Sequence, residues 1–353
     1  MDTPLLNEHR AAHAQLAEYH GCLLPGIFSD LLSEYRAAKE TVAIFDTNWY
    51  AIFSLSGPDR VRYLNAVVSN DIKSVGEAYG TRALLLNPQG HILAELEVYA
   101  LAEKLLVRTH ASVRERTFAT LDKYIIMDDV TLEDLTDQLG SFAVEGPQAG
   151  TVVAQACGLA LEGFSEFANA GLPIDGVPCH LIRRSHFGGH GAEIIAPREH
   201  LGLLWQSMHA RVHAAHGTSI GMTALNALRL EAGIPWFPDD FNDTVIPHEA
   251  ALEATHVSFT KGCYTGQEIV ERVRSRGHVN RRRVSLKFSS LDPPAPLTPL
   301  RAKDVEDKEV GIVTSVAFSP KAATAIGMGY VRREHNAAGS ILEFDGGTAT
   351  VAS

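Results

Sequence analysis

Two segments of the chain repeat one scheme of strand, glycine–proline turn and helix, and this repetition constrains the fold most. FSLSGPDRVRYLNAVVSNDI carries an alternating apolar strand before Gly57-Pro58, and FAVEGPQAGTVVAQACGLAL carries one before Gly146-Pro147, 89 positions later. In both, proline stands at a helix start, where its missing N–H costs no hydrogen bond. A second pair, GHILAELEVYAL and GHGAEIIAP, begins with turns 99 positions apart and places an acid, Glu95 or Glu193, on the strand that follows. We therefore predict two related α+β halves, with chance recurrence of such turns as the alternative.

The length of the chain and the character of its end predict the domain boundaries. A chain of 353 residues is too long for one hydrophobic core. From RRRVSLKF onward the sequence shows short strands and turns, such as VGIVTSVAFS, AIGMGYV and SILEF, after a proline-rich loop at SSLDPPAPLTPL. We predict α+β halves at residues 1–140 and 141–280, and a small β-barrel or sandwich at residues 281–353.

Composition narrows the classes of function. The net charge of −11 disfavours direct nucleic-acid binding, because the field of the whole molecule repels phosphates. The four cysteines are scattered without a Cys-x-x-Cys pair, so we expect neither a disulfide framework nor a metal site. The chain begins acidic and continues as an amphipathic helix pattern through MDTPLLNEHRAAHAQLAEYHG, which does not resemble a signal peptide. No apolar run reaches the roughly 18 residues of a membrane helix. We expect a cytoplasmic protein with reduced thiols and no membrane partner.

The segment FTKGCYTGQE is the strongest candidate for chemistry. Thr265 and Glu268 have the spacing of a capping box, in which each side chain bonds the backbone N–H of the other. Cys263 would then lie just before a helix N-terminus and two residues after Lys261, and both features favour a thiolate. The alternative is a small buried cysteine in a glycine-containing turn, since free cysteine is among the most buried residue types.

Two further features stand out nearby. Glu231 lies in the last turn of a helix that ends at Gly233, where a carboxylate meets the negative end of the macrodipole. A residue that breaks a local rule in this way indicates a function, whereas an exposed surface glutamate is the alternative. ERVRSRGHVNRRRVSLK is a basic segment in an acidic chain, which predicts either a contact with a polyanion or a solvated hairpin.

These segments resemble a known superfamily over nearly the whole chain. KGCYTGQEIVERVRSRGHVNRR resembles the signature of the YgfZ-type folate-binding proteins, whose mitochondrial relatives serve iron–sulfur cluster assembly. LRLEAGIPWFPDDFNDTVIPHEAAL is similar to the matching segment of the wider aminomethyltransferase, or glycine-cleavage T-protein, superfamily. IFDTNWYAIFSLSGPDRVRYLNAVVSNDI and EVGIVTSVAFSPKAATAIGMGYV resemble its N-terminal and C-terminal segments.

The resemblance implies an α+β, aminomethyltransferase-like folate-binding fold. It implies two related halves plus a C-terminal small β-barrel, as a cloverleaf of three domains around a central pocket for tetrahydrofolate. It assigns Glu231 to the pterin ring, and Cys263 and Lys261 to the catalytic positions. The remaining residues it assigns to folate are Glu95, Tyr264, Gln267 and Arg276. One departure is that Ala94-Glu95 replaces the Asp-Asp pair of the aminomethyltransferases, which changes the reach of the acid by one methylene.

Three functions follow as expectations. The first, implied by the signature, is a tetrahydrofolate-binding protein that supports assembly or repair of iron–sulfur enzymes and thereby tRNA modification, with client or assembly proteins as partners. The alternative is an enzyme, a tetrahydrofolate-dependent aminomethyltransferase or one-carbon transferase. The third is a direct role on RNA through Arg281–Arg283, which the acidity of the chain disfavours.

Overall fold

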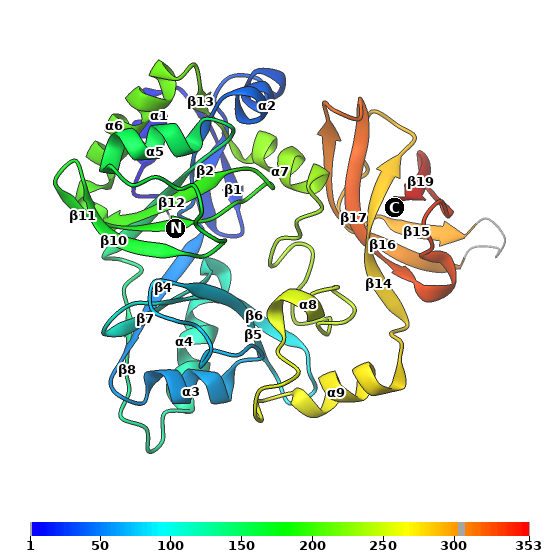
Figure 1. The fold of residues 1–353 in the computed structure, drawn as a ribbon. Helices are drawn as coiled ribbons and strands as arrows, with labels where there is room; N and C mark the ends of the chain where they lie inside the picture. The colour runs from blue at the N-terminus through cyan, green and yellow to red at the C-terminus, as the bar shows by residue number, and fades with distance from the viewer. Residues whose placement is uncertain (1, 303–307, 353) are drawn as a thin grey trace. The chain divides into compact units, whose positions relative to one another are not determined.

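The computed structural model describes residues 2–302 and 308–352, and its main chain divides into two compact units. The first unit comprises residues 1–67, 72–82 and 96–225, and the second comprises residues 68–71, 83–95 and 226–353. The chain is mixed α+β and ends in a barrel, which confirms the predicted fold class (Figure 1). The division into three domains at residues 140 and 280 stays a prediction.

Two antiparallel sheets carry the predicted repeat. One has the strand order β5 (Gly80–Leu86), β6 (Ile92–Ala100), β7 (Lys104–His110), β4 (Tyr50–Ser56), β8 (Thr131–Asp134). The other has the order β10 (Asn169–Ile174), β11 (Val177–Arg183), β12 (Gly191–Pro197), β9 (Leu139–Glu145), β3 (Ala43–Asp46), β13 (Thr218–Ser219), in which the short pairing of β13 with β3 is parallel. The order β5-β6-β7-β4 therefore recurs as β10-β11-β12-β9, which confirms that the two halves are related.

Helices occupy equivalent places in the two halves. The turns at Gly57 and Gly146 have φ of +98° and +137° and lead into α3 (Arg60–Val67) and α5 (Ala149–Cys157). The strands β7 and β12 each lead through a short 3₁₀ turn, η1 (Ala111–Val113) or η2 (Arg198–His200), into α4 (Arg114–Lys123) or α6 (Leu201–Ala214). The predicted equivalence of the strands that carry Glu95 and Glu193 is wrong. Glu95 lies on β6, which corresponds to β11, whereas Glu193 lies on β12, which corresponds to β7.

Hydrophobic burial holds the first unit together. The helices α5 and α6 cover one face of the six-stranded sheet (Figure 1), where apolar side chains of both helices pack on Ile44, Phe142 and Val144. A second apolar cluster joins the two sheets of this unit, and its members include Ile52 and Leu106 from one sheet and Ile195 from the other.

The N-terminal segment differs from its prediction. The expected helix ends early, as α1 (Leu6–Ala11), and the chain continues into a hairpin of β1 (Gln15–Tyr19) and β2 (Cys22–Ile27) before α2 (Leu31–Glu40). The backbone pairing of β1 with β2 outweighs the local helical pattern, as tertiary context often does.

The described part of the second unit contains helical segments and the barrel. The helices are α7 (Met222–Glu231), of which residues 226–231 belong to this unit, α8 (Glu253–His256) and α9 (Gln267–Arg276). The six strands of the closed barrel run in the order β14 (Arg281–Phe288), β17 (Thr324–Arg332), β16 (Glu309–Ser319), β15 (Pro299–Ala302), β18 (Ile341–Phe344), β19 (Gly347–Val351), with a 3₁₀ turn η3 (Arg333–His335) after β17. Closure removes the exposed sheet edges that would otherwise pair with other chains.

Candidate functional site

The segment 261–267 is held in place from two sides. The Lys261 ammonium donates to the backbone carbonyls of Val68 at 2.5 Å and Asn70 at 3.0 Å, and it lies 5.1 Å from the centre of the Tyr264 ring. These contacts anchor the lysine to the segment that precedes β5 and bring Lys261 and Tyr264 together. Cys263 lies between them and is exposed, so the alternative of a small buried cysteine is wrong.

Tyr264 carries an unsatisfied polar atom. The residue is buried, and its hydroxyl has no hydrogen-bond partner among residues 2–302 and 308–352. Burial, followed by the charge of Glu271, raises the pKa of Tyr264 to about 12, so the hydroxyl keeps its proton at neutral pH. A buried hydroxyl without a partner costs free energy. A bound ligand that accepts a hydrogen bond from this hydroxyl would remove the cost.

The predicted capping box does not form. The helix α9 begins at Gln267, and its N-cap is Gly266 in the left-handed region, with no side chain bonded at the cap. The glycine is required because a Cβ at this position would lie 2.7 Å from the Asn87 carbonyl oxygen. Glu268 instead accepts a hydrogen bond from Arg272, one turn along the helix. The close approach of Gly266 to the turn before β6 therefore sets the helix start, and Thr265 does not cap it.

This close approach predicts a difference between two glycines at the ends of α9. Gly266 and Gly277 have φ of +83° and +91°, so alanine is strained by about 1–2 kcal/mol at either position. Only Gly266→Ala also places a methyl group against backbone, and we expect this to add about 1–3 kcal/mol of destabilisation. Thermal unfolding of the two variants measures the difference. Equal losses would show that the approach to Asn87 relaxes without cost.

Glu95 is held by a residue that the sequence did not indicate. Glu95 is on β6, and its Oε1 lies 2.9 Å from Nε2 of His256, at the end of α8. His256 is 2% exposed, and its Nδ1 lies 2.7 Å from the Thr255 hydroxyl. If the hydroxyl donates to Nδ1, the imidazole donates through Nε2 to the carboxylate. In this tautomer the imidazole holds one oxygen of the Glu95 carboxylate.

The other predicted residues are dispersed over the second unit. Glu231 ends α7, and its Oε1 accepts from the Ser319 hydroxyl at 2.5 Å and from the backbone N–H of Lys321 at 3.4 Å, at the end of β16. Gln267 is half-buried at the first turn of α9. Arg276 ends this helix, and its side chain lies outside the described part of the structure.

The predicted basic segment is largely neutralised by ion pairs. Arg272 and Arg274 pair with Glu268 and Glu271 along α9, and Arg281 and Arg282 of β14 pair with Glu249 and Glu253. Arg283 is partly buried and donates to the Ala250 carbonyl oxygen, and this burial lowers its pKa. This arrangement favours the alternative of a solvated hairpin with compensated charge over a polyanion site.

Sequence reasoning missed a buried charge network in the first unit. Arg108 on β7 is fully buried and donates to Glu193 on β12 and, at 2.6 Å, to Glu97 on β6. Arg184 also binds Glu97, at 2.8 Å, and the Tyr99 hydroxyl donates to Glu97 at 2.8 Å. The signal in the sequence is weak: Glu97, Arg108 and Glu193 are charged residues inside strands that are mainly apolar.

The arginines determine the ionisation of this network. Burial alone would raise the pKa of Glu97, but Arg184 and Arg108 lower it well below its usual value. Glu193 behaves in the same way, because Arg108 and the His186 imidazole outweigh its burial and lower its pKa. Both carboxylates are therefore charged at neutral pH inside the protein, where each depends on its partners.

Metal-binding groups and membrane-spanning helices were sought among the described residues. Over residues 2–302 and 308–352, no group of three or more histidine, cysteine, aspartate or glutamate side chains is arranged to hold a metal ion. Within the same ranges, no helix has the length and apolar character that crossing a bilayer requires.

Comparisons with known proteins cover the whole chain. Residues 5–261 match the family described as the GCVT N-terminal domain, and residues 281–352 match the glycine cleavage T-protein C-terminal barrel domain. An aminomethyltransferase of Desulfitobacterium hafniense is 26% identical over 97% of this chain and 92% of its own length. One of Chlorobaculum parvum is 27% identical over 96% of this chain and 92% of its own. The glycine cleavage system aminomethyltransferase T of Bartonella henselae has the same fold, with a TM-score of 0.91 at 24% identity over 100% of this chain and 97% of that one.

These relatives correct the first functional expectation. A role in assembly or repair of iron–sulfur enzymes, and through it in tRNA modification, was expected from the KGCYTGQE segment. The relatives over the full length are aminomethyltransferases, so that expectation is wrong and the enzymatic alternative is favoured.

Proposed function

The chain belongs to the glycine cleavage T-protein family, and from this premise we propose that it is a tetrahydrofolate-dependent aminomethyl or one-carbon transferase. The observation that carries the proposal is the Glu95 carboxylate, which the buried His256 holds at 2.9 Å. By its resemblance, the segment of Glu95 is the one in which the aminomethyltransferases have their acid pair, and this supports Glu95 as the acid of the proposed reaction. The resemblance of residues 261–282 to the YgfZ-type proteins remains a proposal about subfamily alone.

Two groups of the second unit support a folate as the ligand. The Tyr264 hydroxyl is a buried donor with no partner among the described residues, and Glu231 is a carboxylate that accepts hydrogen bonds. An aminopyrimidine ring presents adjacent N–H donors that a carboxylate binds in a planar, paired contact. We assign Glu231 to the pterin, and Tyr264, Gln267 and Arg276 to the remainder of the ligand. When bound, tetrahydrofolate would supply the nitrogen chemistry that accepts the one-carbon unit.

The protein side chains would then orient and move protons. We assign Glu95 as the group that accepts or returns a proton near the reacting nitrogen, and His256 as the residue that positions it. Lys261 supplies a fixed positive charge beside Tyr264, and Cys263 is an exposed thiol between these two residues in the chain. We propose that the thiol contacts the aminomethyl donor or its carrier.

Titration of tetrahydrofolate, followed by calorimetry, tests the ligand assignment. We expect the wild type to bind and Glu231→Gln to bind about tenfold more weakly, because an amide replaces a charged acceptor and a charge-assisted bond is worth about 1.5–3 kcal/mol. Cys263→Ala should bind as the wild type does. Release of ammonia from an aminomethyl donor in the presence of tetrahydrofolate then tests turnover. Binding without turnover by the wild type would refute the transferase, and absence of binding would refute the folate.

A further inference from the structure

The first unit has a pocket that contains none of the residues assigned above. Its volume is about 270 Å³, and its walls come from the turn before β5, the β6–β7 turn, β10 and β11. Backbone hydrogen bonds tie these walls together, from Asn169 N–H to the Ala78 carbonyl at 2.8 Å and from Ala78 N–H to the Ala100 carbonyl at 2.9 Å. The pocket is therefore a fixed feature of this unit.

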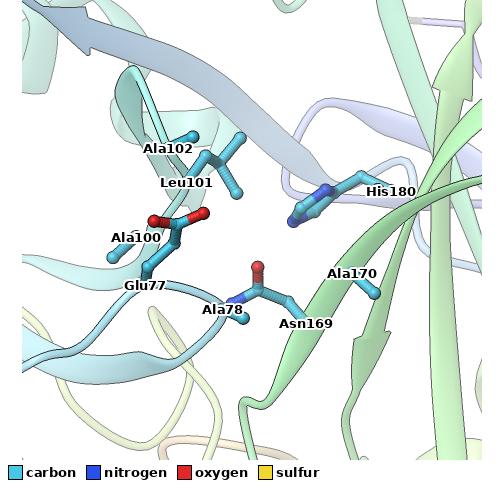
Figure 2. A pocket seen from close by; sticks show the side chains of 9 residues that line it. Glu77, Ala78, Ala100, Leu101, Ala102, Asn169, Ala170 and His180 are labelled. Atoms are coloured by element: carbon cyan, nitrogen blue, oxygen red, sulfur yellow. The ribbon is translucent and has the colours of Figure 1, made fainter.

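Three polar side chains face the same space. Figure 2 shows the Glu77 carboxylate, the Asn169 amide oxygen and the His180 ring directed into the pocket. Asn169 is 2% exposed, and its amide nitrogen donates to the Phe167 carbonyl at 3.3 Å, which leaves the amide oxygen to face the pocket. Nε2 of His180 is buried and has no hydrogen-bond partner among the described residues. A buried polar atom without a partner is rare in folded proteins and indicates a site for a ligand or water.

The charges of the lining determine which ligand fits. Burial, and then Lys104 and Arg108, lower the pKa of His180 to about 4, so the ring is neutral at pH 7. Glu77 is then the only charged side chain among the nine lining residues, and its charge is negative. A carboxylate, an amide oxygen and a neutral imidazole nitrogen can all accept hydrogen bonds. The remaining wall, formed by Leu101 and by alanines, is apolar.

We propose that this pocket binds a small primary amine as its ammonium ion. An ammonium group carries three N–H donors and one positive charge, which match the acceptors of Asn169 and His180 and the charge of Glu77. The apolar wall accommodates a short carbon chain. A cavity of about 150 Å³ holds benzene, so this pocket admits a compound the size of an amino acid or a small diamine.

The test compares ethanolamine with ethylene glycol, which has the same size and differs by exchange of the ammonium group for a hydroxyl group. Binding is followed by NMR through the His180 ring resonance, which a His180→Gln variant identifies. We expect ethanolamine to shift this resonance with a dissociation constant on the order of 1–10 mM, as four heavy atoms allow. We expect ethylene glycol to leave it unchanged.

Substitutions then locate the site. Glu77→Gln should weaken ethanolamine binding about fivefold, the upper end of what loss of one exposed ion pair predicts. Glu115→Gln removes the same charge from the exposed face of α4 and should leave the affinity unchanged. Asn169→Leu should also weaken ethanolamine binding. If this variant does not fold, the comparison of the Glu77→Gln and Glu115→Gln variants alone tests the location of the site. Equal affinity for both compounds, or equal effects of the Glu77 and Glu115 substitutions, would overturn the proposal.

Discussion

Replacement of Arg108 by methionine is expected to lower the free energy of unfolding by about 3–5 kcal/mol, the cost of breaking a buried ion pair by removal of one partner. Arg108 is 0% exposed and binds both Glu97 and Glu193. Methionine fills similar space but leaves Glu193 with the His186 imidazole and the Thr47 hydroxyl as its polar partners. The loss also includes the stacking of the guanidinium over the Tyr50 ring at 4.2 Å.

Unfolding in guanidinium chloride measures the change in the free energy of unfolding, with Arg62→Met as the control. Arg62 pairs with Asp59 and Asp128 at the surface, and its side chain is 62% exposed, so its loss should shift the transition far less. A shift for Arg108→Met as small as that for Arg62→Met would contradict the prediction and show that water enters the network.

The same network predicts how stability depends on pH. The pKa values of Glu97 and Glu193 are lower in the folded protein than in the unfolded chain. Their contribution is therefore fully present above about pH 4.3, the usual glutamate pKa, and is lost as the pH falls toward the folded values. Arg108→Met should weaken this dependence, because Arg108 is a cause of both depressed values.

The sequence predicted those parts of the fold that depend on near neighbours. The glycine–proline turns at Gly57 and Gly146 and the helix end at Gly233, with φ of +71°, follow from steric rules that a few residues reveal. The same reasoning failed at Thr265, where the spacing of a capping box was present but the approach of Gly266 to Asn87 determined the helix start. Local sequence patterns therefore predict that a turn exists more securely than they predict which groups its side chains bond.

The parts of the candidate site that the sequence predicted are those whose residues lie close together in the chain. Lys261 and Tyr264 lie close together in the chain and in space, whereas Glu95 and His256 are 161 positions apart. Arg108 and Glu193 are 85 positions apart, and only the folded sheets bring them into contact. Two charged residues that pair from such distant positions leave no spacing pattern in the sequence. The sequence shows only a charged residue within a mainly apolar strand, and its partner can be identified once the order of the strands is known.

Loss of the Glu95 carboxylate is expected to have the largest effect on the proposed reaction. Glu95→Gln keeps the size of the side chain but removes its ability to take up a proton, and we expect kcat to fall about 10²–10⁴-fold, the usual contribution of a general base. The affinity for tetrahydrofolate should change little, because the assigned pterin contact is made by Glu231. Glu309→Gln, an exposed substitution on β16, is the control for charge.

Substitutions at His256 test whether this imidazole positions the Glu95 carboxylate for the proposed reaction. His256→Gln should lower kcat by less than Glu95→Gln does and should move the acidic limb of the pH–rate profile, because the imidazole bonds directly to the Glu95 carboxylate. Thr255→Val removes the hydroxyl that lies 2.7 Å from Nδ1, and we expect a smaller change in the same direction. If His256→Gln lowers stability but leaves the pH–rate profile unmoved, the imidazole is structural and Glu95 acts without it. If Glu95→Gln retains full turnover, the proton must pass through another group, and the acid of this segment is not the one that the reaction uses.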